Sequence, residues 1–153
     1  MDEKRLKRYK ILKEKNNLRI KDSIWKSNTL FCECIDLLEE CQILSLEETE
    51  MLFEQLQDIF PITNYGCIDW KLVKNCSEIK DIFDIYNFCE KRSKWYILWN
   101  QEDIPSISCK LEIIVENIED VLAVSFDTWL LSKDKSQVIE FYHEGKATYG
   151  KVY

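Results

Sequence analysis

Three short strand-like runs fill the last third of the chain, and they constrain its fold more than any other feature. They span residues 121–131, 137–142 and 146–152. They are rich in the β-branched and aromatic residues that favour strands. The segments SKDKS and His-Glu-Gly separate them, and Gly145 can take the positive φ that a tight turn requires. The pattern predicts an antiparallel β-meander of three to four strands.

The preceding part of the chain begins with a pattern typical of helices. A basic helix is predicted over residues 3–15, and a second begins within residues 27–29, where the side chains are good N-caps. Ser45-Leu-Glu-Glu48 is a capping box that opens a third helix, which Pro61 ends. The apolar positions of the second helix recur at helical spacing and are Leu30, Cys34, Leu37, Leu38 and Cys41.

The middle of the chain mixes helices and a strand. Residues 75–78 (Asn-Cys-Ser-Glu) resemble a second capping box, which predicts a helix that buries Ile79, Ile82, Phe83 and Tyr86. Residues 94–99 (KWYILW) predict a buried strand, and residues 110–117 a short helix. Helices first and a meander last give an α+β fold. We expect one domain over residues 1–153, with the basic helix of residues 1–26 at its periphery.

Composition argues against several classes of function. Three glycines leave no room for a dinucleotide-binding fingerprint or a Walker loop. A net charge of −7 argues against a nucleic-acid partner, which requires clustered cations. No apolar run approaches the ~20 residues that span a bilayer, so a membrane partner is not expected either. No cofactor is expected.

The seven cysteines are expected to be free thiols. Their number is odd, and the N-terminal sequence MDEKRLKRYK lacks the apolar segment of a secretion signal. Both observations favour the reducing cytoplasm. Cys32, Cys34 and Cys41 form no C-x-x-C pair, and the chain has one histidine. A zinc site, which needs four convergent ligands, is therefore not expected.

Charge is distributed unevenly along the chain. Residues 1–26 have a net charge of +6, and residues 27–153 one of −13. Residues 27–70 contain ten acidic residues and no Lys, Arg or His. Like charges four residues apart on a helix repel, and helices that need only solubility mix both signs. The stretch therefore favours a surface that attracts a basic partner, and two helices with solvated outer faces are the alternative.

Other functions remain open at the two ends of the chain. His143 lies in the His-Glu-Gly turn and can form a catalytic pair with a Cys or Asp side chain. Asp127 and Glu140 are predicted on adjacent strands, where two carboxylates can face each other. A small hydrolase is thus one alternative. An adaptor that binds RNA or a membrane through the basic N-terminus is another.

Three strings of residues resemble a known family. The strings are SFDTW from Ser125, IEFYHEG from Ile139 and WYILWN from Trp95. They are similar to sequences in bacterial immunity proteins of contact-dependent growth inhibition (CDI) systems. The resemblance covers the chain from Trp95 onward, and the helical half only in size and character. It implies a small cytoplasmic protein without enzymatic activity. Such a protein binds the C-terminal domain of its cognate toxin and blocks the active site or substrate surface.

The resemblance and the charge pattern together predict a toxin-binding site. Many such toxin domains are nucleases, often RNases that act on tRNA, and a nuclease needs a basic groove to hold phosphates. An acidic protein is complementary to that groove. The first predicted patch consists of Glu33, Asp36, Glu40, Glu47, Glu48 and Glu54. The second, at the end of the sheet, consists of Asp127, Glu140, His143 and Glu144.

Overall fold

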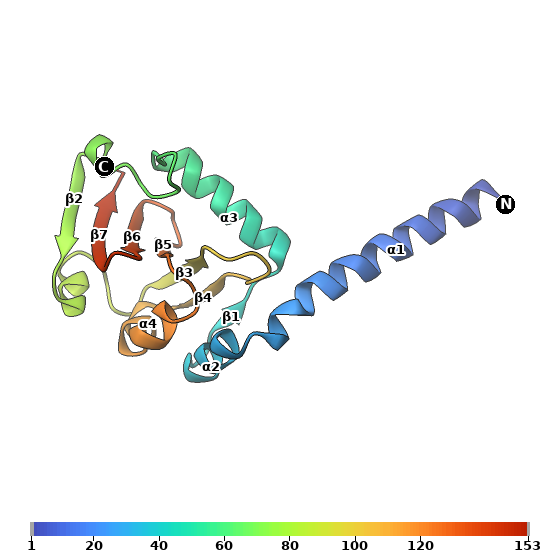
Figure 1. Cartoon of the computed structure of the whole chain (residues 1–153), viewed down its shortest axis with the longest axis horizontal. Coiled ribbons are helices and arrows are strands. Elements are labelled where there is room, and N and C mark those ends of the chain that lie inside the picture. Colours follow the sequence, from blue (N-terminus) through green and yellow to red (C-terminus); the bar gives the residue numbers. More distant parts are fainter. Residues whose placement is uncertain (1, 153) are drawn as a thin grey trace.

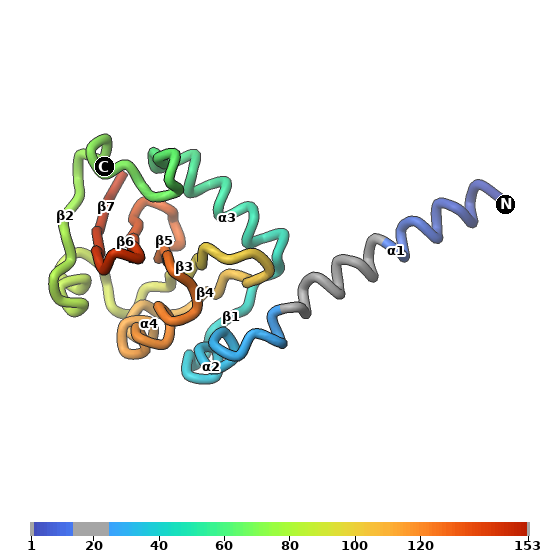
Figure 2. The backbone as a smooth tube through the Cα atoms, in the orientation of Figure 1, coloured from blue at the N-terminus to red at the C-terminus, as the bar shows by residue number. Residues whose placement is uncertain are grey.

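The computed structural model shows one mixed sheet-and-helix body and a long N-terminal helix (Figure 1). It describes residues 2–152, and within this range it describes the backbone but not the side chains of residues 14–24 (Figure 2). The predicted α+β class is confirmed. Helices do precede the meander, but strands from the middle of the chain join the same sheet.

The sheet is antiparallel and has seven strands in the order β1-β4-β3-β5-β6-β7-β2. The predicted meander is confirmed as its β5-β6-β7 part, in which Leu130 lies opposite Ile139 and Ile139 opposite Tyr149. The strands span Gln42–Ile43 (β1), Asn75–Ile79 (β2), Lys94–Trp99 (β3), Ile107–Lys110 (β4), Thr128–Ser132 (β5), Gln137–Tyr142 (β6) and Lys146–Lys151 (β7).

Alternate residues of the strands build two separate cores. Ile97 and Leu130 lie in one cluster, and their neighbours Leu98 and Leu131 lie in the other, because successive side chains point to opposite faces of a sheet. The first face is covered by α2 (Thr29–Leu37), η3 (Ile82–Asn87), α4 (Leu111–Glu116) and α5 (Ile118–Leu122). The second face is covered by α3 (Leu46–Ile59) and by the following segment, which contains η2 (Trp70–Leu72).

Both predicted helix starts are confirmed by their caps. The Asn28 side chain accepts a hydrogen bond from the backbone N–H of Phe31 at 3.0 Å, and α2 begins at the next residue. The Ser45 hydroxyl accepts one from the N–H of Glu48 at 3.1 Å and starts α3. The predicted apolar stripe of α2 needs correction. Phe31, Cys34 and Leu38 are buried there, whereas Leu30 and Leu37 are exposed.

Two predicted boundaries are wrong. Residues 75–78 do not cap a helix, because their backbone pairs with β7 as strand β2, and the helical turn η3 after them is capped by Asp81 instead. The run at 121–131 is not one strand either. Its first residues end α5, and β5 begins only at Thr128. Strands β1 and β4 were not predicted.

The N-terminal helix α1 spans Glu3–Ser23 and is longer than predicted. It leads into η1 (Ile24–Ser27), and the side chains of residues 2–13 are all exposed. Among the described residues, none of the helices combines the length and the apolar character needed to cross a membrane.

Candidate partner-binding site

The acidic stretch of the sequence is divided between the two faces of the sheet. Glu33 and Asp36 are exposed on α2, on one face, and the acidic residues of α3 are exposed on the other. Glu40 lies on the connection between the helices, where its carboxylate is 3.6 Å from the Lys110 ammonium. The residues of the first predicted patch are therefore divided between two helices on opposite faces of the sheet and the connection between them.

Helix α3 carries its own acidic stripe. Glu47, Glu50, Glu54 and Asp58 are spaced three and four residues apart, so they share one side of the helix, and all are exposed. The helix contains no Lys, Arg or His. Glu47 lies in the first turn, where the helix dipole favours an anion, but Glu54 and Asp58 lie toward the C-terminal end, where it does not. A contribution to helix stability therefore does not explain why acidic residues occupy positions 54 and 58.

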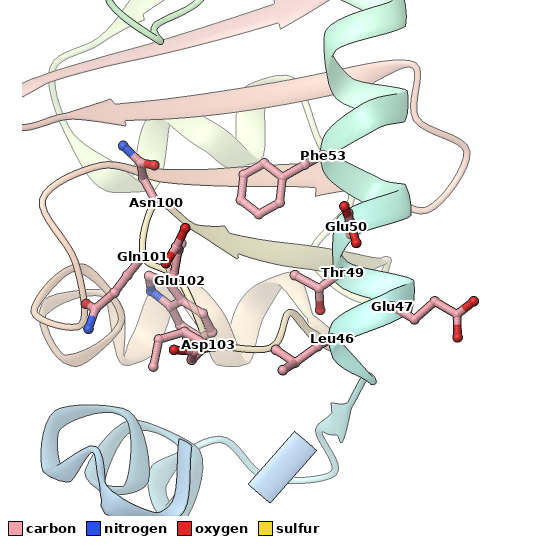
Figure 3. Close-up of a pocket in the computed structure, with 11 residues that line it drawn as sticks. Leu46, Glu47, Thr49, Glu50, Phe53, Asn100, Gln101, Glu102 and Asp103 are labelled. Carbon is pink, nitrogen blue, oxygen red and sulfur yellow. The ribbon is translucent and has the colours of Figure 1, made fainter. Parts of the chain in front are cut away.

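An open groove lies between α3 and the loop that follows β3 (Figure 3), with a volume of about 710 Å³. Leu46, Thr49 and Phe53 project from α3 toward the loop, whereas Glu47 extends away from it. The loop contributes a run of polar and acidic residues, 100–103. The side chains that line the groove are apolar (Leu46, Phe53, Trp99, Ile104), acidic (Glu47, Glu50, Glu102, Asp103) or neutral polar (Thr49, Asn100, Gln101).

Two of the predicted residues of the second patch form a pair. The Asp127 carboxylate accepts hydrogen bonds from the backbone N–H of His143 at 2.8 Å and lies 3.0 Å from its Nδ1 atom. The His143 side chain is 45% exposed and that of Asp127 only 14%. Asp127 therefore holds the turn between β6 and β7 and orients the imidazole. Glu144, the next residue in that turn, is exposed.

Glu140 differs from the other residues of the predicted patch. It lies opposite Trp129 in β5 rather than Asp127, and it is only 4% exposed. Its carboxylate accepts hydrogen bonds from Trp129 Nε1 (2.9 Å), Trp70 Nε1 (3.0 Å) and the backbone N–H of Ile68 (2.7 Å). A buried carboxylate is tolerated when such donors surround it. Glu140 thus joins the segment that covers the second face to the centre of the sheet.

A backbone hydrogen bond connects the groove to the Asp127–His143 pair. The backbone N–H of Asn100, in the groove loop, donates a hydrogen bond to the carbonyl oxygen of Asp127 at 3.1 Å. Phe126, directly before Asp127, is 87% exposed. Glu47 of the first patch lines the groove, and Asp127 of the second patch is bonded to the loop on the other side of it.

The sequence analysis missed four residues of this region. Glu102 and Asp103 lie outside the cation-free stretch, and Glu50 and Phe126 were not selected. The available signal was the Gln-Glu-Asp run between a strongly predicted strand and Pro105. A polar run at that point is typical of an exposed loop at the end of a strand.

The cysteines are free thiols, and three of them are deeply buried. Burial raises the pKa of Cys34 and Cys89 to about 12 and the pKa of Cys109 to about 11. A thiol that stays protonated is a poor nucleophile and a poor metal ligand. Within residues 2–152, leaving aside the side chains of 14–24, no group of three or more His, Cys, Asp and Glu side chains is placed to hold a metal ion.

A comparison with known protein families identifies the family of this chain. The family model described as "CdiI immunity protein EcoliA0-like" matches residues 28–150. The chain belongs to this family. A comparison with curated proteins gave no match.

Membership in this CdiI family makes the chain an immunity protein of a CDI system, and such a protein binds a cognate toxin. The match begins at Asn28, the N-cap of α2, so α1 lies outside it. The groove, the α3 stripe and the Asp127–His143 pair all lie inside it.

Proposed function

We propose that the protein neutralises its cognate CDI toxin in the cytoplasm by binding the toxin's C-terminal domain and covering its active site or substrate surface. It carries out no reaction of its own. The observation that supports this most is the acidic stripe of α3, whose four carboxylates are exposed on a helix without a single cation. A surface of one sign steers a partner of the opposite sign toward it.

The toxin domain is, in this proposal, a nuclease, most simply an RNase that acts on tRNA. An enzyme that holds phosphates needs a cationic groove, and carboxylates in that groove displace the polyanionic substrate. Fast, salt-sensitive association is expected from such charge complementarity, and a few buried anchors then set the dissociation rate.

Of the predicted residues, Glu47, Glu48 and Glu54 on α3 are proposed to meet the toxin together with the surface residues of the second patch, Asp127, His143 and Glu144. Glu33 and Asp36 lie on the helix that covers the opposite face of the sheet, and Glu40 lies beside Lys110. These three residues are proposed to make a minor contribution, by attracting the basic toxin during association. Glu140 is left out because its carboxylate is buried inside the fold.

Co-expression with the neighbouring toxin domain tests the proposal. The chain is expected to restore growth of cells that produce its own toxin domain and to co-purify with it, and to do neither with an unrelated CDI toxin domain as control. Growth arrest that persists with the cognate pair, together with no co-purification, would contradict the proposal.

A hydrolase is the second candidate, because the Asp127–His143 pair has the arrangement of a base and its orienting group. A hydrolase that protects cells by chemistry would lose protection when His143→Ala removes the imidazole. Binding without chemistry predicts that this variant still inhibits when it is present in excess, because losing the His143 contact lowers the affinity without abolishing inhibition. An adaptor that uses basic α1 is tested by deleting residues 2–20, which should leave toxin binding intact.

A further inference from the structure

The groove beside α3 has the composition of a site for one kind of side chain. Its lining combines the apolar side chains of Leu46 and Phe53, the buried residues Trp99 and Ile104, and four acidic residues. Arg and Lys side chains combine an apolar stem with a charged head, and they bury the stem while the head meets polar groups. The apolar and acidic parts of the lining therefore complement the two parts of a cationic side chain.

The size of the groove favours a segment of chain over a single side chain. Its volume of about 710 Å³ lies within the range of sites that bind ligands of several functional groups. Among the residues that the structure describes, every one that lines the groove is apolar, neutral polar or acidic, so none of them neutralises the four carboxylates. A basic loop or helix end of a partner can supply that charge.

An exposed aromatic residue stands next to the groove. Phe126 is 87% exposed, and the residue after it is tied to Asn100 of the groove loop by a backbone hydrogen bond of 3.1 Å. Large aromatic side chains are over-represented among the residues that dominate binding at interfaces, and leaving one in water is unfavourable. Burying Phe126 against a partner that occupies the groove would therefore contribute favourable binding free energy.

We infer that the groove between α3 and residues 99–104 receives a basic segment of the toxin domain. An Arg or Lys side chain of this segment lies along Phe53, and its charged head meets Glu50 and Glu102 (Figure 3). Phe126 packs against an apolar patch of the same toxin. This inference rests on the proposed function. It names the contact that anchors the complex.

Two sets of variants of the full chain test it against purified cognate toxin domain. Glu50→Gln with Glu102→Gln removes two negative charges from the groove lining, and Phe126→Ala removes the exposed aromatic ring. The matched control is Glu78→Gln with Glu90→Gln, which removes two exposed charges from β2 and from the loop after η3, away from the groove. Equal urea midpoints for all variants verify that each one folds.

The groove variants are expected to weaken binding by about tenfold or more, and the charge variant also to reduce the dependence of affinity on salt. Phe126→Ala is expected to act mainly on the dissociation rate. The control should change affinity by less than about threefold, as for charges remote from an interface.

Groove variants that bind like the control would overturn the groove inference and leave the proposed function in place. Wild-type protein that neither binds nor protects would instead overturn the proposed function itself. Binding that weakens equally for groove and control variants would show that only net charge matters, and it would also overturn the groove inference.

Discussion

Carboxylates occupy two regions of this protein with opposite surroundings. At the centre of the sheet, Glu140 is 4% exposed and accepts three hydrogen bonds from N–H donors. At the groove, Glu50 and Glu102 belong to a lining in which the described residues include no cation. A buried carboxylate requires hydrogen-bond donors within the fold, whereas a carboxylate at the surface can be solvated by water instead. One residue type thus holds the structure at one place and stays available to a partner at the other.

The largest effect on stability is expected from Glu140→Gln. The amide keeps one acceptor oxygen, but its NH₂ group faces an N–H donor, and each buried donor left unpaired costs about 1–3 kcal/mol. We expect unfolding free energy to fall by about 2–4 kcal/mol in urea titrations followed by tryptophan fluorescence. Glu144→Gln, on the exposed turn, is the control and should change it by less than about 0.5 kcal/mol. An unchanged midpoint for Glu140→Gln would remove the distinction between the two regions.

The second largest effect on stability is expected at Gly150, which packs against Trp70 beside Glu140. A Cβ atom added at Gly150 would lie 2.4 Å from Trp70 Cζ3, and the indole cannot move away without straining its bond to Glu140. Gly150→Ala is therefore expected to cost about 1–3 kcal/mol, as for other overpacked sites. Lys151→Ala, at the exposed next position of β7, serves as the control. Equal stability of the two variants would show that the Trp70 contact is loose.

The buried thiols make the stability of the protein depend on pH. Burial holds the pKa of Cys34 and Cys89 at about 12, against an ordinary value of 9.0 in the unfolded chain. The folded state therefore binds more protons above pH 9, and stability falls as pH rises from 9. We expect a loss of about 1 kcal/mol per thiol one pH unit above that value. Urea midpoints at neutral and alkaline pH check this, and Cys76→Ser, at an exposed thiol, should leave the trend unchanged.

The sequence predicted what depends on neighbours along the chain. Ser45 and Asn28 cap helices through residues three positions ahead, and the meander joins strands that follow each other directly. These contacts are local, so composition and spacing report them. The family was likewise predicted from short strings of residues, and the comparison confirmed it.

The sequence did not predict what depends on distant partners. The Asn-Cys-Ser-Glu run at 75–78 has the pattern of a cap, but pairing with β7 makes it an edge strand. Glu140 has the sequence context of a surface acid, yet donors from Trp70 and Ile68, far back in the chain, bury it. The groove is likewise made by α3 and a loop some fifty residues later, so no window of sequence contains it.

The smallest effect on stability is expected at the two ends of the acidic stripe on α3. Glu47 lies in the first turn of the helix and Asp58 in the last, so the helix dipole acts on them with opposite sign. Glu47→Gln is expected to destabilise the protein and Asp58→Asn to stabilise it, each by about 0.3–1 kcal/mol at low ionic strength and less in salt. Each variant is the other's control in paired thermal or urea unfolding. A gain from Asp58→Asn would mean that the fold keeps this carboxylate at a cost, which a partner-binding role explains. A loss would mean that Asp58 belongs with Glu140 among the carboxylates that stabilise the structure.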